Sequence, residues 1–265
     1  MLRRGRPASA AKRARRAAAT LALVVAAAAA PRRAGALMGL LAAAALGFGV
    51  HNELFPERRH KIAGTLIPIA MKGLNKAMRN LRAELLKGLK GKVLDVGCAS
   101  GLYLPYAKDK PVSEYVALEP NTHMHGQLRT TVDEANLPFP VRITGGFIDA
   151  LEEENGTYDC VILGNVLCEV PCQASFLNSV RELLKPGGCV LFSEHVLDDD
   201  VLWRRAMQHM LAWWWCAVSD GCHCNRRTMP KLLSTFGEAN VKWSTVYAGS
   251  FPWTARFELG IAVRR

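Results

Sequence analysis

The chain has 265 residues, half of them hydrophobic, which is enough for one sizeable α/β domain with a packed core and an appendage. Its formal net charge is +11, yet residues 1–52 hold nine Lys and Arg and no acid, which leaves 25 basic against 23 acidic residues in the remainder. The basic excess therefore belongs to the N-terminal segment, and we expect no nucleic-acid partner for the folded domain.

Residues 1–56 have the composition of a basic leader with apolar segments. An apolar run at 17–30 is interrupted by Pro-Arg-Arg and followed by an uncharged run at 34–50. As a helix, the second run spans about 25 Å, slightly less than a hydrocarbon core of about 30 Å. A membrane anchor or hairpin, an organelle transit peptide and a secretory signal all remain open. We expect association with a membrane of the endoplasmic reticulum or an organelle, or a soluble organelle matrix if the leader is cleaved.

Residues 57–90 predict a basic amphipathic helical region. Apolar residues recur at helical spacing with Lys and Arg between them, namely Leu74, Met78, Leu81, Leu85 and Leu89. Such a helix either lies on anionic lipid or covers the cofactor, or it leads into the domain by packing on its sheet. We favour the packed position.

From residue 91 to 265, strand-like apolar runs alternate with helix-like segments. The runs lie at 92–97, 114–119, 141–145, 158–164 and 188–196. The alternation predicts a parallel, doubly wound sheet with right-handed crossovers. In such a sheet the ligand binds outside the carboxyl ends of the strands.

The turn after the first run is the first candidate site. Gly97 lets the chain leave the strand sharply, and Gly101 permits close approach because it has no Cβ. The turn lacks the G-x-G-x-x-G fingerprint, which argues against a dinucleotide oxidoreductase. Asp95 precedes the first glycine, where a carboxylate repels a pyrophosphate and attracts a cation.

Two more acids follow the next two strands. Glu119 ends the second run, where an acid accepts hydrogen bonds from ribose hydroxyls. Asp149 follows the third run and is placed to accept from an adenine amino group, with Ile148 against the ring. These positions indicate an adenosine ligand without phosphates and with positive charge, which fits S-adenosyl-L-methionine.

The chain resembles class I S-adenosylmethionine-dependent methyltransferases of the type 11 group in five successive segments: "VLDVGCASG", "YVALEPN", "GGFIDAL", "YDCVILGNVL" and "LLKPGGCVLFSEH". Four more segments are similar to the methyltransferase-like protein seven subgroup of membrane-associated thiol S-methyltransferases: "VLCEV", "SEHV", "DGCHCNRRT" and "FELGIAVRR". Two positions depart from the family pattern. Ala99 stands where the family usually has a glycine. Met229 stands directly after the Arg-x-Thr step, where the family often has a tryptophan.

The resemblance implies an α/β, Rossmann-like seven-stranded methyltransferase sheet of order 3-2-1-4-5-7-6 over residues 91–265, with helices on both faces and the last strand antiparallel. It implies S-adenosyl-L-methionine as cofactor and a small apolar acceptor such as an alkyl thiol. The alternatives are an organellar lipid, quinone or sterol methyltransferase and a non-catalytic membrane-associated protein that retains the fold. The expected cofactor-binding residues are Asp95, Gly97, Cys98, Ser100, Gly101, Glu119, Pro120, Asn121, Ile148, Asp149, Asn165 and Leu167.

Two residues are candidates for the catalytic step. His195, at the end of the fifth run, is the first candidate for deprotonating or orienting the acceptor, and a hydrogen-bonded structural histidine is the equal alternative. Asp220 is the weaker candidate, because it can instead cap or brace a lid loop. The eight cysteines include no CxxC pair, so we expect buried reduced thiols and no metal site.

Residues 200–218 predict a helix inserted after the fifth strand. One helical stripe is apolar and is expected to be core: Trp203, Met207, Met210, Leu211 and Trp214. Trp213 and Trp215 point elsewhere and suggest an apolar substrate wall or an interfacial contact.

Overall fold

The computed structural model describes residues 33–248 and 251–265, so the first apolar run of the predicted leader lies outside the described residues. The helices are α2 (Arg33–Leu54), α3 (Pro56–Leu85), α4 (His125–Ala135), α5 (Gln173–Leu183), α6 (Leu202–Val218) and α7 (Met229–Phe236). The strands are β1 (Gly91–Val96), β2 (Val112–Leu118), β3 (Val141–Thr144), β4 (Tyr158–Gly164), β5 (Leu184–His195), β6 (Val241–Tyr247) and β7 (Arg256–Val263).

The strands form one seven-stranded sheet of order β3-β2-β1-β4-β5-β7-β6. Strands β1 to β5 are parallel, and β7 runs antiparallel to both of its neighbours. The predicted order and the antiparallel last strand are confirmed. Strand β5 begins earlier than expected, because Leu184 already pairs with Tyr158 before the register shifts to the pair Cys160 and Cys189.

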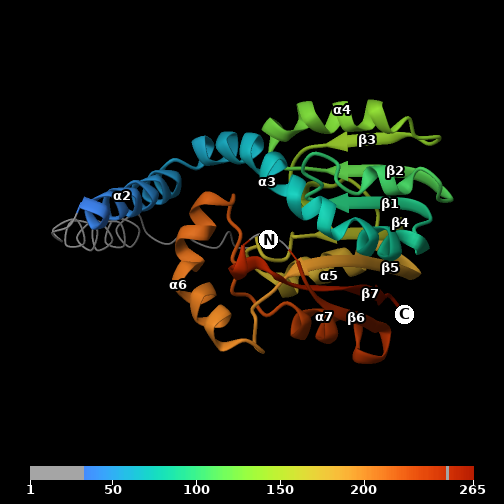
Figure 1. Cartoon of the computed structure of the whole chain (residues 1–265). Coiled ribbons are helices and arrows are strands. Elements are labelled where there is room, and N and C mark those ends of the chain that lie inside the picture. The colour runs from blue at the N-terminus through green and yellow to red at the C-terminus, as the bar shows by residue number, and fades with distance from the viewer. Residues whose placement is uncertain (1–32, 249–250) are drawn as a thin grey trace.

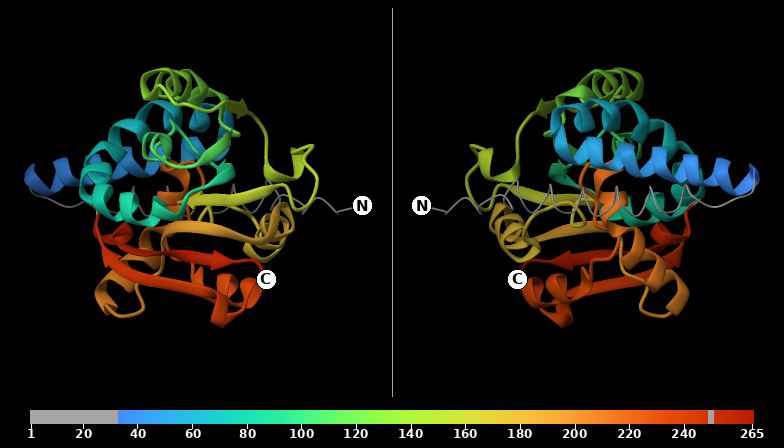
Figure 2. Two further views of the ribbon diagram at one scale, coloured as in Figure 1. Left: turned by 90° about the vertical axis from the view of Figure 1, so that its right-hand side faces the viewer. Right: turned by 90° about the vertical axis from the view of Figure 1, so that its left-hand side faces the viewer.

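Helices cover both faces of the sheet (Figures 1 and 2). On one face, alternate residues of β1, β4 and β5 pack against α5 and α7 in one hydrophobic cluster. The intervening residues of the same strands pack against α4 and the segment that follows α3 in a second cluster. This division follows from the period of two along a strand, which sends successive side chains to opposite faces.

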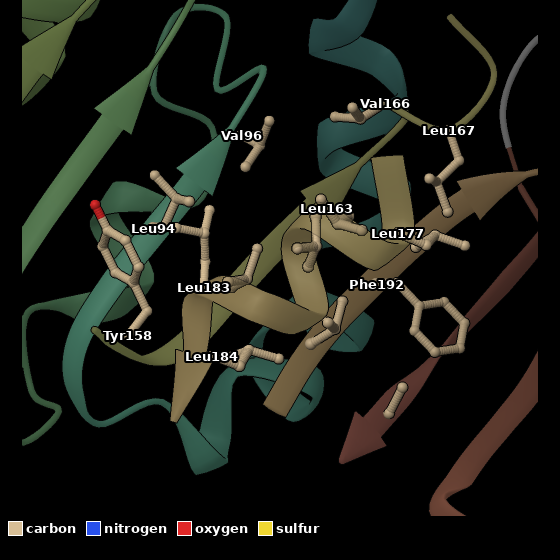
Figure 3. Packing of buried hydrophobic residues seen from close by; sticks show 14 of the residues in the cluster. Leu94, Val96, Tyr158, Leu163, Val166, Leu167, Leu177, Leu183, Leu184 and Phe192 are labelled. Carbon is tan, nitrogen blue, oxygen red and sulfur yellow. The ribbon is translucent and has the colours of Figure 1, made fainter. Parts of the chain in front are cut away.

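The larger cluster joins the sheet to α5. Figure 3 shows Leu94, Leu163 and Phe192 of three adjacent strands near Leu177 and Leu183 of α5. Burial of each such side chain contributes about 1.5–3 kcal/mol, so this cluster holds the strand ends in fixed positions.

Helix α3 packs on the sheet as favoured above. Met78 is fully buried and lies in a third cluster with Phe257 and Leu259 of β7. Leu81 of the predicted apolar stripe is 37% exposed, so the buried face is narrower than the spacing suggested. Because α3 bridges α2 and the sheet, it connects the N-terminal part to the domain (Figure 1).

The prediction that the apolar stripe of α6 is core is wrong. Trp203 is 53% exposed and Met210 is 75% exposed, whereas Gln208 is buried. The Gln208 side-chain amide donates to the carbonyl oxygens of Val196, Cys224 and Trp253. Gln208, which is hydrogen-bonded to loop backbone, therefore occupies the inward face of α6, and part of the apolar stripe is exposed to solvent.

Helix α2 contains the second apolar run and packs against α6. The indole nitrogen Nε1 of Trp214 donates to the carbonyl oxygen of Ala45 at 2.8 Å. Within residues 33–248 and 251–265, no helix has both the length and the apolar character needed to cross a membrane.

Candidate active site

The turn after β1 has three residues with left-handed backbone. Gly97, Ala99 and Gly101 have φ of 61°, 49° and 84°. A Cβ on Gly97 would lie 3.0 Å from Val166 Cγ2, and one on Gly101 would lie 2.8 Å from Leu104 Cδ1. Both glycines are therefore required by conformation and by close packing within the chain.

Ala99 occupies this turn in a conformation that L-residues with a Cβ adopt at a cost of roughly 1–2 kcal/mol. Its backbone N–H donates to Oε2 of Glu119 at 2.8 Å. The Glu119 carboxylate thus holds the turn in place. In the same turn, Cys98 is buried, and the Ser100 carbonyl oxygen accepts from Thr131 Oγ1 at 2.7 Å.

Glu119 joins the turns after β1 and β2. Its Oε1 accepts from the backbone N–H of Asn121 at 2.7 Å, so each carboxylate oxygen has one partner within the chain. A carboxylate has about four lone-pair sites, which leaves two for the hydroxyls of a ribose. Burial raises the pKa of Glu119, and the two backbone donors partly oppose that shift. Pro120 between them is exposed.

Asp95 is fully buried at the end of β1. Its Oδ2 accepts from the Tyr115 hydroxyl at 2.7 Å, whereas Oδ1 has no hydrogen-bond partner among the described residues. Burial raises the pKa of Asp95 to about 7; the bond from Tyr115 lowers it and the charge of Glu119 raises it. A buried acid with one unpaired oxygen is stabilised by a cation at this position.

Two acids missed by the sequence analysis surround the same edge of the sheet. Glu194 is buried on β5, accepts from the backbone N–H of Val166 at 2.9 Å, and has its pKa raised by burial to about 7. Glu169 is accessible to solvent yet closely surrounded by protein, so desolvation and the neighbouring Cys222, Asp220 and Glu119 raise its pKa well above the usual range. Glu169 follows β4 and Glu194 lies near the end of β5, and these positions at the carboxyl ends of strands could have identified both acids from the sequence.

This concentration of acids fits a positively charged ligand. Asp95, Glu119 and Glu194 have raised pKa values, because burial disfavours their ionised forms. S-adenosyl-L-methionine carries a sulfonium and an ammonium group. Either group can supply the positively charged partner that Asp95 Oδ1 does not have within the described residues. The residues present therefore fit the expected cofactor.

Four further predicted cofactor residues lie at the ends of β3 and β4. Ile148 is half-buried against the larger core cluster, and Asp149 is exposed beside it. Asn165 has left-handed backbone, with φ of 61°. Leu167 is fully buried in the core cluster, so its side chain packs within the protein (Figure 3). Its carbonyl oxygen accepts from Gln173 Nε2 at 2.9 Å and from Arg226 Nη1 at 3.0 Å.

Asp220 links three parts of the chain near Glu119. Its Oδ2 accepts from Asn121 Nδ2 at 3.0 Å, and its Oδ1 lies 2.7 Å from His60 Nδ1 and 3.4 Å from Arg59 Nε. The backbone of Asp220 is left-handed, with φ of 59°. These contacts favour the bracing role over the catalytic role.

His195 meets partners at both ring nitrogens. Its Nε2 lies 2.9 Å from Cys222 Sγ, and its Nδ1 lies 3.2 Å from Asn165 Oδ1. Burial disfavours the charged forms of His195 and Cys222, but it is outweighed at His195 by the charge of Cys222, and at Cys222 by a hydrogen bond from Cys168 and the charge of His195. The pKa of His195 is therefore raised, and that of Cys222, which Cys168 also contacts, is lowered well below the usual range.

The cysteines are partly as expected. All eight are free and six are buried, which confirms buried reduced thiols. The expectation of no metal site stays a prediction, but Cys168, His195 and Cys222 bring three possible ligand atoms within 4.8 Å of one another. They were missed because the search relied on short cysteine spacings, whereas these residues are far apart in the chain.

An aromatic group borders Cys222. Trp215 Nε1 donates to Cys222 Sγ at 3.1 Å. Its ring centroid lies 5.6 Å from that of Phe251 and 5.8 Å from that of Trp253, and Phe251 and Trp253 stack at 5.1 Å. Trp215 thus provides an apolar wall beside the thiol, consistent with the suggestion that it faces away from the stripe.

Comparisons with known proteins agree with this geometry. The family model described as "Methyltransferase domain" matches residues 71–242. Thiol S-methyltransferase TMT1B of Homo sapiens is 27% identical over 176 residues, covering 64% of this chain and 71% of that protein. Thiol S-methyltransferase TMT1A of Homo sapiens is 27% identical over 167 residues, covering 60% and 68%. A solved structure of a SAM-dependent methyltransferase from Thermotoga maritima has 12% identity and a TM-score of 0.55, covering 78% of this chain and 99% of that one, and it supports the fold.

Proposed function

This chain belongs to the methyltransferase-domain family and is an S-adenosyl-L-methionine-dependent methyltransferase, and we propose that its acceptor is a small apolar thiol. The observation that carries the proposal is the pairing of both ring nitrogens of His195 with Asn165 and Cys222. A histidine engaged in this way is not free to take a proton from an acceptor. A thiol, with a pKa of about 8.5, is partly ionised near neutral pH and requires little proton transfer.

The chain's contribution is binding and orientation. When bound, S-adenosyl-L-methionine supplies a methyl group activated by a positively charged sulfur. Glu119 accepts from the ribose while it holds the turn at Ala99, and Asp95 supplies negative charge from the end of β1. Transfer then depends on holding the acceptor in line with the methyl group and on excluding water.

The aromatic wall supports an apolar acceptor. Trp215, Phe251 and Trp253 form a continuous set of ring contacts beside Cys222. An aliphatic or aromatic thiol buries its carbon skeleton against such rings, at about 25 cal/mol per Å² of apolar surface removed from water. The two human relatives bear the name thiol S-methyltransferase, which agrees with this acceptor class.

A turnover screen of the full-length purified protein tests the acceptor. Alkyl and aryl thiols, phenols, quinols and lipids are each incubated with labelled S-adenosyl-L-methionine over about pH 6–9. We expect methylation of thiols, with a rate that rises as pH approaches the thiol pKa of about 8.5. Turnover on phenols, quinols or lipids and none on thiols overturns the proposal. Cofactor binding without turnover on any acceptor favours the non-catalytic alternative.

A matched pair of acid variants ties that turnover to the site. Glu119→Ala removes both carboxylate contacts, so cofactor binding should weaken by roughly 1.5–3 kcal/mol. Glu154→Ala removes an exposed acid and should leave binding unchanged. Equal binding by both variants would mean that Glu119 does not contact the cofactor.

We also propose that residues 1–56 associate the enzyme with a membrane of the endoplasmic reticulum or an organelle, ahead of the helical region 57–90 and the domain 91–265. The support is the apolar run at 34–50 together with large exposed hydrophobic residues on α2, α3 and α6 and between them: Phe48, Leu54, Phe55, Ile69, Leu202, Trp203 and Met210. Helix α2 contacts both α3 and α6, so these residues belong to adjoining elements. Large exposed hydrophobic residues on adjoining elements are typical of membrane or protein contact sites.

A reporter fusion tests this location. Residues 1–56 joined to a fluorescent protein should sediment with membranes and resist alkaline carbonate extraction. Release into a soluble organelle fraction with loss of the leader would support cleavable targeting in its place. A full chain carrying Trp203→Ser and Met210→Ser should bind membranes less tightly if α6 takes part.

A further inference from the structure

Three soft metal donors meet where β4 and β5 end and where the loop after α6 returns. Cys168, His195 and Cys222 are all buried, and their ligand atoms lie within 4.8 Å of one another. We propose that these residues bind one Zn²⁺ ion and leave its fourth coordination position for the acceptor thiol. The metal site stands on this cluster alone, whereas its use by a thiol rests on the proposed function.

The spacing of the donors suits tetrahedral zinc. With Zn–S near 2.3 Å and Zn–N near 2.0–2.1 Å, a tetrahedral site separates sulfur from nitrogen by about 3.6 Å and two sulfurs by about 3.8 Å. The Cys222 Sγ and His195 Nε2 atoms lie 2.9 Å apart, so that pair opens by about 0.7 Å to admit the ion. Cys222 lies in the loop after α6 and not in a strand, so a shift of its side chain by this amount leaves the sheet unchanged.

The outer nitrogen of His195 has the partner expected of a zinc ligand. Nδ1 lies 3.2 Å from Asn165 Oδ1, and an amide oxygen at that position makes Nδ1 the protonated nitrogen. Nε2 then presents its lone pair toward the two sulfurs. Metal-binding histidines almost always have such a partner, because it fixes the tautomer and the ring orientation.

The two sulfurs also have supporting neighbours. Trp215 Nε1 donates to Cys222 Sγ at 3.1 Å, a contact that stabilises negative charge on a thiolate. Cys168 Sγ lies 3.2 Å from the carbonyl oxygen of Asn165, to which a thiol donates. Coordination replaces that weak bond, since the thiol proton leaves when the metal binds.

The donor set selects the metal and its role. Two sulfurs and one imidazole favour zinc over the hard cations Mg²⁺ and Ca²⁺, which take oxygen ligands. No fourth His, Cys, Asp or Glu joins the group among the residues that the structure describes. Structural zinc sites have four protein ligands, whereas catalytic sites have three and an open position, so this set corresponds to the second type.

An acceptor thiol in the open position reacts as follows. The thiol loses its proton to water and binds zinc as a thiolate. Its sulfur forms a bond to the methyl carbon while the bond between that carbon and the sulfonium sulfur breaks. The products are the methyl thioether and the neutral demethylated cofactor, and the one proton released balances the lost positive charge.

Metal analysis of the full chain tests the site directly. Protein purified, stripped with a chelator and reloaded with Zn²⁺ should hold one zinc per chain, and Co²⁺ loading should give thiolate-to-cobalt absorption. Cys168→Ser and Cys222→Ser should lose both signals. Cys172→Ser, at an exposed cysteine, and Cys160→Ala, at a buried one, are the matched controls and should retain them.

A further variant tests the residue that supports the His195 ligand. Asn165→Gly keeps a residue that tolerates φ of 61° and removes the amide that faces His195, so zinc affinity should fall about 10–100-fold. Circular dichroism and a cooperative urea-unfolding transition show that each variant is folded. A variant that fails both checks is replaced by Cys222→Ala, judged by the same two signals.

The outcomes distinguish this inference from the proposed function. No zinc in the reloaded protein, zinc that survives in both ligand variants, or a Cys168–Cys222 disulfide in place of metal binding each overturns the metal site. Zinc at these residues with turnover only on phenols or lipids overturns the thiol function and leaves the metal site standing. Full thiol turnover by metal-free protein overturns the role of zinc in the reaction and leaves the thiol function standing.

Discussion

Nδ1 of His60 on α3 lies 2.7 Å from Oδ1 of Asp220, in the loop that follows α6. The same carboxylate accepts from the side-chain amide of Asn121, whose backbone N–H in turn donates to Glu119. The leading helix is therefore connected through one aspartate to the carboxylate that we expect to accept from the ribose. Contacts outside the family match at 71–242 thus reach the expected cofactor site.

Asp220→Asn should weaken cofactor binding without stopping catalysis. Asn tolerates the left-handed backbone at φ of 59°, so the substitution removes charge and leaves the local conformation intact. We expect the KM for S-adenosyl-L-methionine to rise about tenfold, which corresponds to about 1.4 kcal/mol, with kcat retained. Asp109→Asn, at an exposed site, is the control. A kcat loss of about 10²–10⁴ with unchanged KM would instead make Asp220 an acid–base catalyst.

Ala99→Gly should stabilise the protein. Glycine removes the cost of a Cβ at φ of 49°, and part of that gain is offset by the greater freedom of the unfolded chain. We expect the free energy of unfolding to rise by about 0.5–1 kcal/mol in urea denaturation, with cofactor binding retained. Ala150→Gly, at an exposed position without positive φ, should be destabilising. Destabilisation by both substitutions would mean that Ala99 is not strained.

Cofactor binding should release protons near neutral pH. The pKa of Asp95 is about 7 in the folded chain, and a bound cation lowers it by favouring the carboxylate. Affinity should therefore rise with pH up to about 7 and then level off. Calorimetry in buffers of different ionisation enthalpy measures the released protons, and Asp95→Asn should release fewer. An affinity independent of pH between about 5 and 8 would contradict a cationic ligand next to this acid.

The stability of the cofactor-free protein should depend on pH in the opposite direction. Because the folded chain retains the Asp95 proton up to about pH 7 while the unfolded chain loses it near 3.8, folding binds protons in that window. The contribution of Asp95 to stability is present below about pH 4 and is lost as pH rises through about 7. Asp95→Asn should flatten this part of the urea-unfolding profile against pH.

Leu167→Ala should affect stability far more than cofactor affinity. Leu167 is fully buried in the larger core cluster, so truncation leaves a cavity and should cost about 2–5 kcal/mol. Leu202→Ala, at a residue that is 70% exposed, should change stability by at most about 0.5 kcal/mol. Cofactor affinity measured on the folded fraction should match the wild type. A large loss of affinity with normal stability would show that the Leu167 side chain contacts the ligand.

The sheet and the cofactor turn could be predicted because both depend on local pattern. Apolar runs of strand length with helices between them determine a parallel sheet, and the turn from Asp95 to Gly101 carries its own conformational requirements. The prediction that the apolar stripe of α6 is core was wrong because local pattern is not enough to place a helix face. Helical periodicity identifies which residues share a face, but it does not say whether Gln208 or Met210 faces the protein.

The sequence by itself determined that Asp95 and Glu119 lie at strand ends and indicated a positively charged ligand, because these follow from short-range spacing and residue chemistry. The strand order was predicted from the resemblance to a known family, and the structure confirmed it. Only the tertiary structure decided that Cys168, His195 and Cys222 share one site. Their meeting depends on β4 and β5 being neighbours and on a loop returning after α6, and no periodicity along the chain encodes that closure. The same long-range packing joined Asp220 to Asn121 and His60, contacts that favour a bracing role over a catalytic one.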